Sequence, residues 1–197
     1  MKSLQFRTGV VLLLIMLLSG CGINNIPNYD EQVKATWSQV ENQYQRRADL
    51  IPNLVQTVKG YAAQEKSTLT AVVEARAKVG GLQATKDLLN NPQALKQFEQ
   101  AQSQLGNALQ RLMVVVERYP DLKSNQNFLA LQSQLEGTEN RISVARRDYI
   151  AAVQKYNTEI RTFPGRIWHA ILYSNMPIRE TFTATTENAE KPPQVKF

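Results

Sequence analysis

A single cysteine, Cys21, stands near the N-terminus of this 197-residue chain. It follows an unbroken apolar run at residues 10–18 and the two small residues Ser19 and Gly20, and basic residues precede the run. Positive charge, a short apolar core and a small-residue cleavage site are the layout of an export signal. One thiol cannot form an internal disulfide, and a thiolate is a nucleophile that can accept a transferred group.

The residues Leu18-Ser19-Gly20-Cys21 resemble the lipobox of bacterial lipoproteins. The resemblance implies cleavage between Gly20 and Cys21 and acyl chains on Cys21, and two or more such chains hold a protein stably on a bilayer. A transmembrane helix needs about 20 apolar residues, whereas polar residues follow Cys21 almost at once. We therefore expect an acyl anchor, with a plain signal peptide or signal anchor as the alternative. In enteric-type cells, an aspartate after the cysteine commonly retains a lipoprotein in the inner membrane. Because Gly22 stands there in this chain, we expect the periplasmic leaflet of the outer membrane if the cell is Gram-negative.

Glu136 and Glu139 are carboxylates whose spacing could support acid–base chemistry, because they lie about one helical turn apart. Two carboxyl groups can act as acid and base when their surroundings push their pKa values apart. The only histidine is His169, whereas metal sites of carboxylate bundles use Glu-x-x-His pairs from facing helices. The sequence therefore predicts no metal, no cofactor and no enzymatic activity. An envelope hydrolase that uses Glu136 or Glu139 is the weaker alternative.

Arg47 occupies a position in an apolar series where leucine would be expected. Burying an unpaired charge is costly, so an arginine there needs an acidic partner. We predict a buried ion-pair cluster of Arg46, Arg47, Glu136 and Glu139, which would fix the register of the helices more than it would add stability. The alternative is a cleft near Arg47 that binds the carboxylate of a small ligand, as in a carrier protein.

The net charge of the chain limits the class of partner. The formal charge is +6, and removal of residues 1–20 would take away two basic residues, leaving 21 basic against 17 acidic side chains. An excess of about +4 is too small to indicate a nucleic-acid-binding protein. No spacing typical of a phosphate-binding loop or a zinc finger is present. We therefore expect no nucleic-acid partner.

Three long apolar series, spaced by three and four positions, predict helices. The first covers residues 29–79 and ends at two glycines, the second covers residues 92–119 after a capping asparagine, and the third covers residues 128–163. Residues 166–173 predict a short amphipathic helix, which we expect to pack over one end of the bundle; a membrane interface is the alternative for this segment.

Helices that each carry one apolar stripe can bury it only against one another. The sequence therefore predicts an all-α fold, an elongated antiparallel bundle of three long helices plus a short C-terminal helix. We expect a lipoprotein signal peptide at residues 1–20, a tether at 21–28, the bundle at 29–176 and an extended tail at 177–197. Pro52, inside the first series, predicts a bend that lets a long helix wrap its partners, with a hinge as the alternative.

Long segments of the chain resemble the LemA family. They are WSQVENQYQRRADLIPNLVQTVKGYA at 37–62, ERYPDLKSNQNFLALQSQLEGTENRISVARRDYI at 117–150, YNTEIRTFP at 156–164, and the closing PQVKF. The resemblance runs from about Tyr29 to Phe197 and implies an all-α rod of long antiparallel helices, tethered to a bacterial membrane. Many members look as though they carry an N-terminal transmembrane helix, and this chain departs from them by its lipobox. The family has no assigned biochemical role, so no catalytic residue is carried over.

Together these observations predict a membrane-anchored helical lipoprotein of the bacterial envelope that acts as an interaction or scaffold module. Its expected partners are the membrane, through acyl chains on Cys21, and proteins that the sequence does not identify. A small-ligand carrier and an envelope hydrolase are the two alternative functions.

Overall fold

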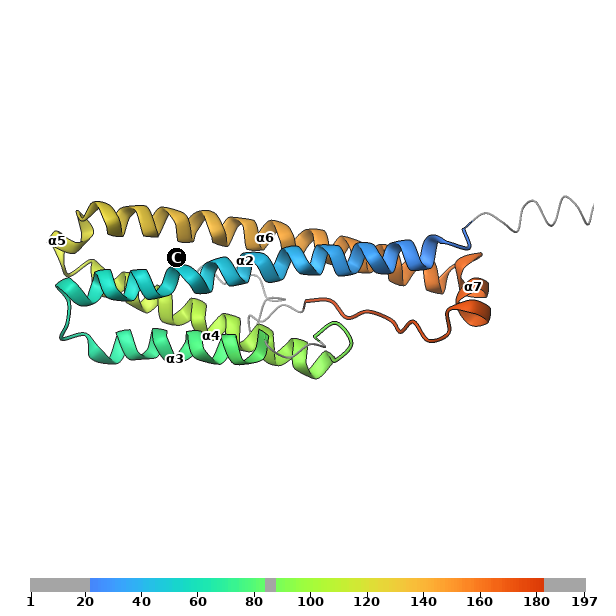
Figure 1. The fold of residues 1–197 in the computed structure, drawn as a ribbon, viewed down its shortest axis with the longest axis horizontal. Helices are drawn as coiled ribbons and strands as arrows, with labels where there is room; N and C mark the ends of the chain where they lie inside the picture. The colour runs from blue at the N-terminus through green and yellow to red at the C-terminus, as the bar shows by residue number, and fades with distance from the viewer. Residues whose placement is uncertain (1–21, 84–87, 183–197) are drawn as a thin grey trace, which may run out of the picture.

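The computed structural model describes residues 22–83 and 88–182, and these ranges contain helices and no strand (Figure 1). The helices are α2 (Asn25–Tyr61), α3 (Lys66–Gln83), α4 (Pro92–Val116), α5 (Pro120–Lys123), α6 (Gln126–Arg161) and α7 (Gly165–Leu172). Helices α2, α3, α4 and α6 alternate in direction along one rod, with α5 at one end and α7 at the other. The prediction of an all-α antiparallel bundle with a short C-terminal helix is confirmed.

The first predicted helix is divided into two helices, so the rod contains four long helices and not three. α2 ends at Tyr61, residues 62–65 form a turn, and α3 returns beside α2. The division is invisible in the pattern, because a spacing of three and four continues across a four-residue turn. α3 also runs through Gly80 and Gly81, so this glycine pair does not end the helix.

The connection between α4 and α6 holds the turn between α2 and α3. Glu65 Oε1 accepts hydrogen bonds from Tyr119 Oη at 2.9 Å and from Arg118 Nη2 at 3.0 Å. Asn125 Nδ2 donates to Tyr61 Oη at 2.9 Å. The two connections at this end of the rod are therefore fastened to each other by side chains that lie far apart in the sequence.

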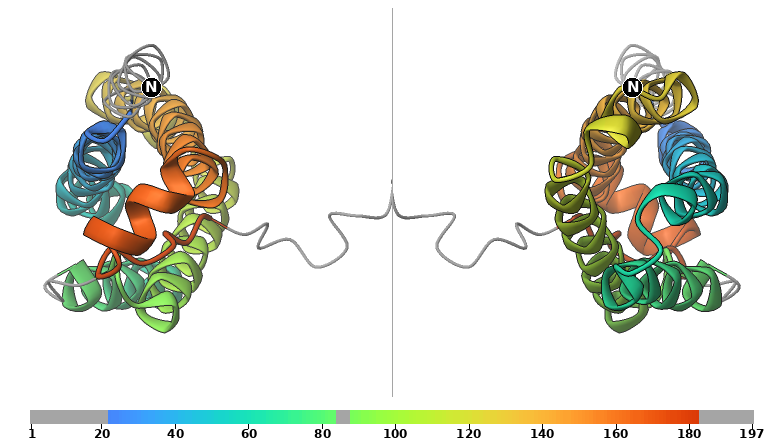
Figure 2. Two further views of the ribbon diagram at one scale, coloured as in Figure 1. Left: turned by 90° about the vertical axis from the view of Figure 1, so that its right-hand side faces the viewer. Right: turned by 90° about the vertical axis from the view of Figure 1, so that its left-hand side faces the viewer.

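Helices α2 and α6 are much longer than α3 and α4. They contain 37 and 36 residues, or about 55 Å each at 1.5 Å per residue, whereas α3 and α4 contain 18 and 25 residues. The part of the α2–α6 pair beyond α4 is covered by α7 and the segment that follows it (Figures 1 and 2). Tyr156 Oη donates to Pro177 O at 3.0 Å, and Tyr149 Oη donates to Glu180 O at 2.9 Å. The described part of the predicted tail, residues 177–182, therefore lies along the bundle.

Helix α2 begins earlier than the sequence pattern indicates. It starts at Asn25, and the side chain of Ile26 is fully buried. The predicted tether at residues 21–28 is therefore wrong from residue 25 onward. Because the acidic Asp30 occupies the next position on the buried side of α2, Ile26 is separated from the apolar series in the sequence.

Buried apolar side chains form two clusters along the rod. The cluster nearer α7 contains an aromatic group of Trp37, Phe98, Tyr149 and Phe182, whose neighbouring ring centroids lie 5.2–6.1 Å apart. The cluster nearer α5 includes Ile51, Leu54, Leu105, Leu112, Leu122 and Phe128. Arg47 lies in the stretch of α2 that passes from one cluster to the other.

Pro52 lies on the exposed side of α2, and the helix continues through it. A proline has no N–H for the carbonyl four residues before it, which here belongs to Ala48. Arg76 Nε of α3 donates to this Ala48 oxygen at 2.9 Å. Helix α3 therefore supplies the hydrogen bond that Pro52 removes.

Candidate functional site

Arg47 connects three helices from a buried position. Its side chain is 4% exposed, and its Nη1 donates to both carboxylate oxygens of Glu139, at 2.9 and 3.0 Å. Its Nη2 donates to the side-chain and main-chain oxygens of Gln102. The ring centroid of Tyr44 lies 5.2 Å from the guanidinium carbon, within the range of a cation–π contact. One guanidinium group thus joins α2, α4 and α6.

The structure brings together two of the four residues predicted to form the ion-pair cluster. Arg47 and Glu139 form a salt bridge, in which the side chain of Glu139 is 55% exposed. Arg46 and Glu136 do not join it. Arg46 is exposed, because successive positions of a helix lie about 100° apart around its axis. Glu136 is also exposed and accepts a hydrogen bond from Gln132 Nε2 at 3.0 Å.

A groove of about 260 Å³ lies beside the Arg47–Glu139 pair, between α4 and α6. Its lining is mostly apolar and consists of Arg47, Gly106, Leu109, Gln110, Met113, Leu135, Glu136 and Glu139. In the described part of the chain, Arg47 Nε and Gln102 Nε2 make no hydrogen bond although both atoms are buried. An acceptor group of a small, mostly apolar molecule in this groove could satisfy Arg47 Nε, because unsatisfied buried donors gain from an acceptor. Gln102 does not line the groove, and Glu136 and Glu139 place two carboxylates in it.

A second buried ion pair holds the C-terminal segment. Asp30 Oδ1 accepts hydrogen bonds from Arg179 Nη2 at 2.6 Å and Nε at 3.1 Å, and Lys34 Nζ lies 2.9 Å from Asp30 Oδ2. Arg179 also donates to the side chain of Asn90, and its main chain exchanges two hydrogen bonds with Asn157. Burial raises the pKa of Asp30, but hydrogen bonds from Lys34 and Arg179 outweigh burial, so the pKa is lowered.

Sequence reasoning did not identify this second pair. The signal that was available is the same as for Arg47: Asp30 falls between the buried residues Ile26 and Val33 on one side of α2. Its partner, Arg179, lies 149 residues away in the irregular segment after α7, where no periodicity indicates burial.

Within the described ranges, residues 22–83 and 88–182, no group of three or more His, Cys, Asp or Glu side chains is placed to hold a metal ion. The Nε2 atom of His169 lies 2.8 Å from the carbonyl oxygen of Met176, which is a local contact near α7. No helix in these ranges is long and apolar enough to cross a membrane. The predicted cleavage residue Gly20 and lipid-attachment residue Cys21 lie outside the described residues.

Sequence comparison identifies bacterial relatives. Magnetosome proteins MamQ 2 and MamQ 1 of Paramagnetospirillum magneticum are each 32% identical over 159 residues, which cover 72% of this chain and 58% of the relative. Magnetosome protein MamQ of Magnetospirillum gryphiswaldense is 30% identical over 153 residues, or 68% of this chain and 55% of the relative. Protein LemA of Metamycoplasma hominis is 24% identical over 140 residues, or 71% and 60%. The chain thus spans less than two thirds of the length of these relatives.

The model of the LemA family matches residues 36–197, which is most of the chain. The matched range contains Arg47, Gln102 and Glu139 and begins after Asp30. It also includes the turn at residues 62–65 and every described helix after α2. The family resemblance predicted from the sequence is confirmed: this chain belongs to the LemA family.

Proposed function

We propose that this protein is a lipid-anchored helical module of the bacterial envelope that binds other proteins along its rod. The observation that carries the proposal is the lipobox at residues 18–21, which stands directly before the rod. Because α2 begins at Asn25, acyl chains on Cys21 would hold the molecule by one end. In a Gram-negative cell, Gly22 favours the periplasmic leaflet of the outer membrane.

Exposed apolar side chains on three helices of the rod give positions at which protein binding can be tested. Val114 of α4 is 66% exposed, Val73 of α3 is 49% exposed and Val144 of α6 is 47% exposed. Exposed apolar side chains mark binding surfaces when they lie together, although single ones are normal. The names of the relatives refer to a magnetosome and to the family and not to a reaction. We assign no enzymatic activity.

Labelling with palmitate in the producing bacterium tests the anchor. The wild-type protein should incorporate the label and the Cys21→Ala variant should not, because the alanine has no thiol to acylate. Ser19→Ala is the matched control and should keep the label, since the cleavage site remains small. An unlabelled wild-type protein, or equal labelling of Cys21→Ala, would contradict the anchor.

Crosslinking in intact cells tests the binding role. Photoreactive residues at positions 73, 114 and 144 sample α3, α4 and α6, and we expect at least one position to capture a defined protein partner. Exposed Asn42 gives a polar control position on α2. Capture that does not differ between these positions and the control would contradict a specific binding surface.

The groove beside Arg47 supports a second candidate function, a carrier of a small anionic ligand. The supporting observation is the buried Nε–H group of Arg47, which lacks an acceptor in the described residues and belongs to a residue that lines the groove. Native mass spectrometry of the purified protein should then detect a bound molecule that Arg47→Leu loses and Arg46→Leu keeps. A hydrolase has less support, because Glu136 and Glu139 are both exposed and Glu139 is already paired with Arg47.

A further inference from the structure

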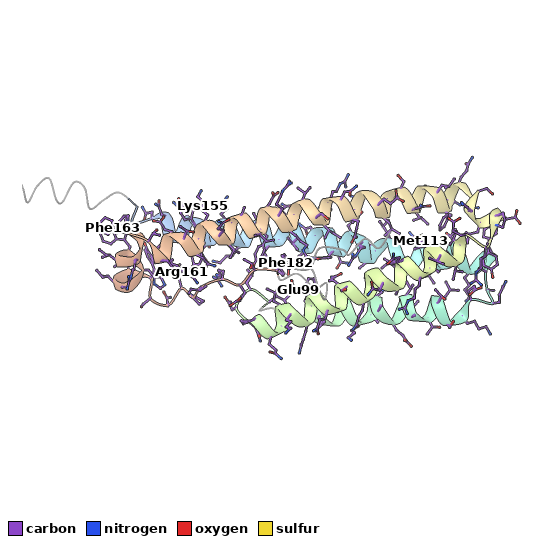
Figure 3. The ribbon with its side chains drawn as sticks, turned by 180° about the vertical axis from the view of Figure 1, so that it is seen from behind. Glu99, Met113, Lys155, Arg161, Phe163 and Phe182 are labelled. Atoms are coloured by element: carbon purple, nitrogen blue, oxygen red, sulfur yellow. The ribbon has the colours of Figure 1, made fainter. Side chains whose placement is uncertain are left out.

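Four apolar side chains are exposed together at the end of the rod that carries α7. Phe163 is 83% exposed, Ile171 is 68%, Leu172 is 50% and Ile167 is 46% exposed. Ile167 and Ile171 are spaced by four residues within α7, which places their side chains along one side of that helix, and Phe163 lies in the turn that leads into it. We call these four residues the end face; Figure 3 shows Phe163 at the extreme end of the rod.

Contacts of α7 and of the segment after it hold the end face in place. Trp168, Tyr173 and Met176 pack against the apolar cluster nearer α7. Gly165, the first residue of α7, is buried, and a Cβ atom there would clash with the carbonyl oxygen of Glu159. Only glycine allows this approach, so α7 is fixed closely against the end of α6. The end-face side chains therefore stay exposed at this end of the rod.

The chain enters the rod at the same place. A Cβ atom on Gly22 would lie 3.8 Å from Pro164 Cγ and 3.8 Å from Glu159 Oε1. Asn25 Nδ2 donates to the same Glu159 oxygen at 3.1 Å. The residue next to Gly22 in the sequence is Cys21, and consecutive Cα atoms are about 3.8 Å apart. A lipid on Cys21 would therefore be attached beside the turn that carries Phe163.

Basic side chains accompany the end face. Arg161 and Arg166 are exposed on either side of Phe163 in the sequence, and Figure 3 shows Arg161 near it. Exposed arginines beside an apolar surface suit the boundary of a bilayer, where anionic headgroups attract basic residues. Four side chains are also far fewer than the 20–30 residues, roughly, that each partner contributes to a stable protein interface.

We propose that the end face inserts into the outer part of the bilayer that holds the acyl chains of Cys21, so that the rod stands on its α7 end. This inference rests on the lipid anchor proposed above. It adds a second, protein-borne contact with the membrane, which fixes the orientation of the rod. The α5 end, with the turn at residues 62–65, is then separated from the bilayer by the length of α2, which is about 55 Å.

Two leucines provide a matched pair of positions for the test. Leu172 of the end face is 50% exposed, and Leu129 at the α5 end of α6 is 48% exposed. The acylated Cys21 sulfur is a thioether, so Leu172→Cys or Leu129→Cys would be the one reactive thiol of the mature chain. Each acylated variant is labelled with a polarity-sensitive fluorophore and reconstituted into vesicles of phosphatidylethanolamine and phosphatidylglycerol that contain nitroxide-labelled lipid.

The fluorophore at position 172 should shift to the blue and lose fluorescence to the nitroxide lipid, whereas the one at position 129 should do neither. Replacing Phe163 and Ile167 with serine should abolish both effects at position 172 without detaching the protein from the vesicles. The matched Val114→Ser change, which is far from the end face, should leave them intact. Because these side chains are exposed, the substitutions should not unfold the bundle.

Flotation of the same vesicles separates the two proposals. If the protein floats but position 172 behaves like position 129, the end face does not contact lipid and this inference is overturned while the anchor stands. A blue shift without lipid quenching, accompanied by a doubled mass in light scattering, would assign the end face to a second copy and would also overturn it. If the acylated protein does not float, both the anchor and the inference fail.

Discussion

Two charged residues, Arg47 and Asp30, lie on the buried side of α2, and each is paired with a residue far away in the sequence. Buried pairs of this kind are weak evidence for stability, because desolvation offsets much of the attraction. They are stronger evidence for register, since a one-residue shift of a helix would separate the partners. Arg47 could be identified from its position in the apolar series and Glu139 from its place in the third predicted helix, but the hydrogen bonds to Gln102 could not.

The Arg47→Leu variant should remain helical and lose little stability. Leucine removes the cost of burying the guanidinium, and Glu139 is exposed enough to be solvated without its partner. The loss should come mainly from Gln102, whose buried side-chain oxygen is left without a hydrogen-bond donor at a cost of about 1–3 kcal/mol. The double variant Arg47→Leu with Gln102→Leu should recover most of that loss in urea unfolding followed by circular dichroism. Collapse of helicity in the single variant would contradict this description.

The Asp30–Arg179 pair should make the free energy of unfolding depend on pH in the acidic range. The pKa of Asp30 is held below its usual value of 3.8, since the hydrogen bonds from Lys34 and Arg179 outweigh the effect of burial. The unfolded carboxyl group therefore binds protons more readily than the folded one, and its stabilising contribution is present above pH 3.8 and lost as the pH falls below it. The free energy of unfolding should decrease as the pH is lowered below about 4. The decrease should be smaller in the Asp30→Asn variant. Equal slopes for the two proteins would exclude Asp30 as the source.

At the scale of elements, helix ends were predictable where a local capping residue marks them. Asn91 Oδ1 accepts a hydrogen bond from the backbone N–H of Ala94 at 3.1 Å, as its place before Pro92 predicted. The α2–α3 turn was not predictable, because its stabilising contacts come from Arg118, Tyr119 and Asn125 in a distant connection. The predicted end of the second helix at Pro120 is wrong by a few residues, since α4 ends at Val116 and Pro120 begins α5. A proline fits the first turn of a helix as well as it stops one.

The Pro52–Arg76 relationship gives a prediction about two neighbouring helices. Arg76→Met should destabilise the protein by roughly 1 kcal/mol, because the Ala48 oxygen loses the donor that replaces the missing proline N–H. In a Pro52→Ala background the alanine N–H can bond to Ala48, so the same Arg76→Met change should cost less. A double-mutant cycle measured by urea unfolding tests this coupling. Additive effects of the two changes would show that Arg76 does not compensate for Pro52.

At the scale of the whole molecule, the sequence predicts a helical rod but not how its parts cover one another. Helices α2 and α6 extend beyond α3 and α4, and this difference leaves room for α7 and the segment to Phe182. The apolar residues of that segment are too few and too irregular to indicate burial, although Phe182 joins the aromatic group of the core. The same arrangement brings α7 to the point where α2 begins, which is why the proposed anchor and the end face lie together.

The mass of the intact protein, extracted from membranes of the producing bacterium, is the most direct test of the proposed anchor. We predict a chain that begins at Cys21 and carries the added mass of a diacylglyceryl group and a further acyl chain, with fragment ions that place the addition on that residue. A chain that retains residues 1–20, or a processed chain whose Cys21 is an unmodified thiol, would contradict the account.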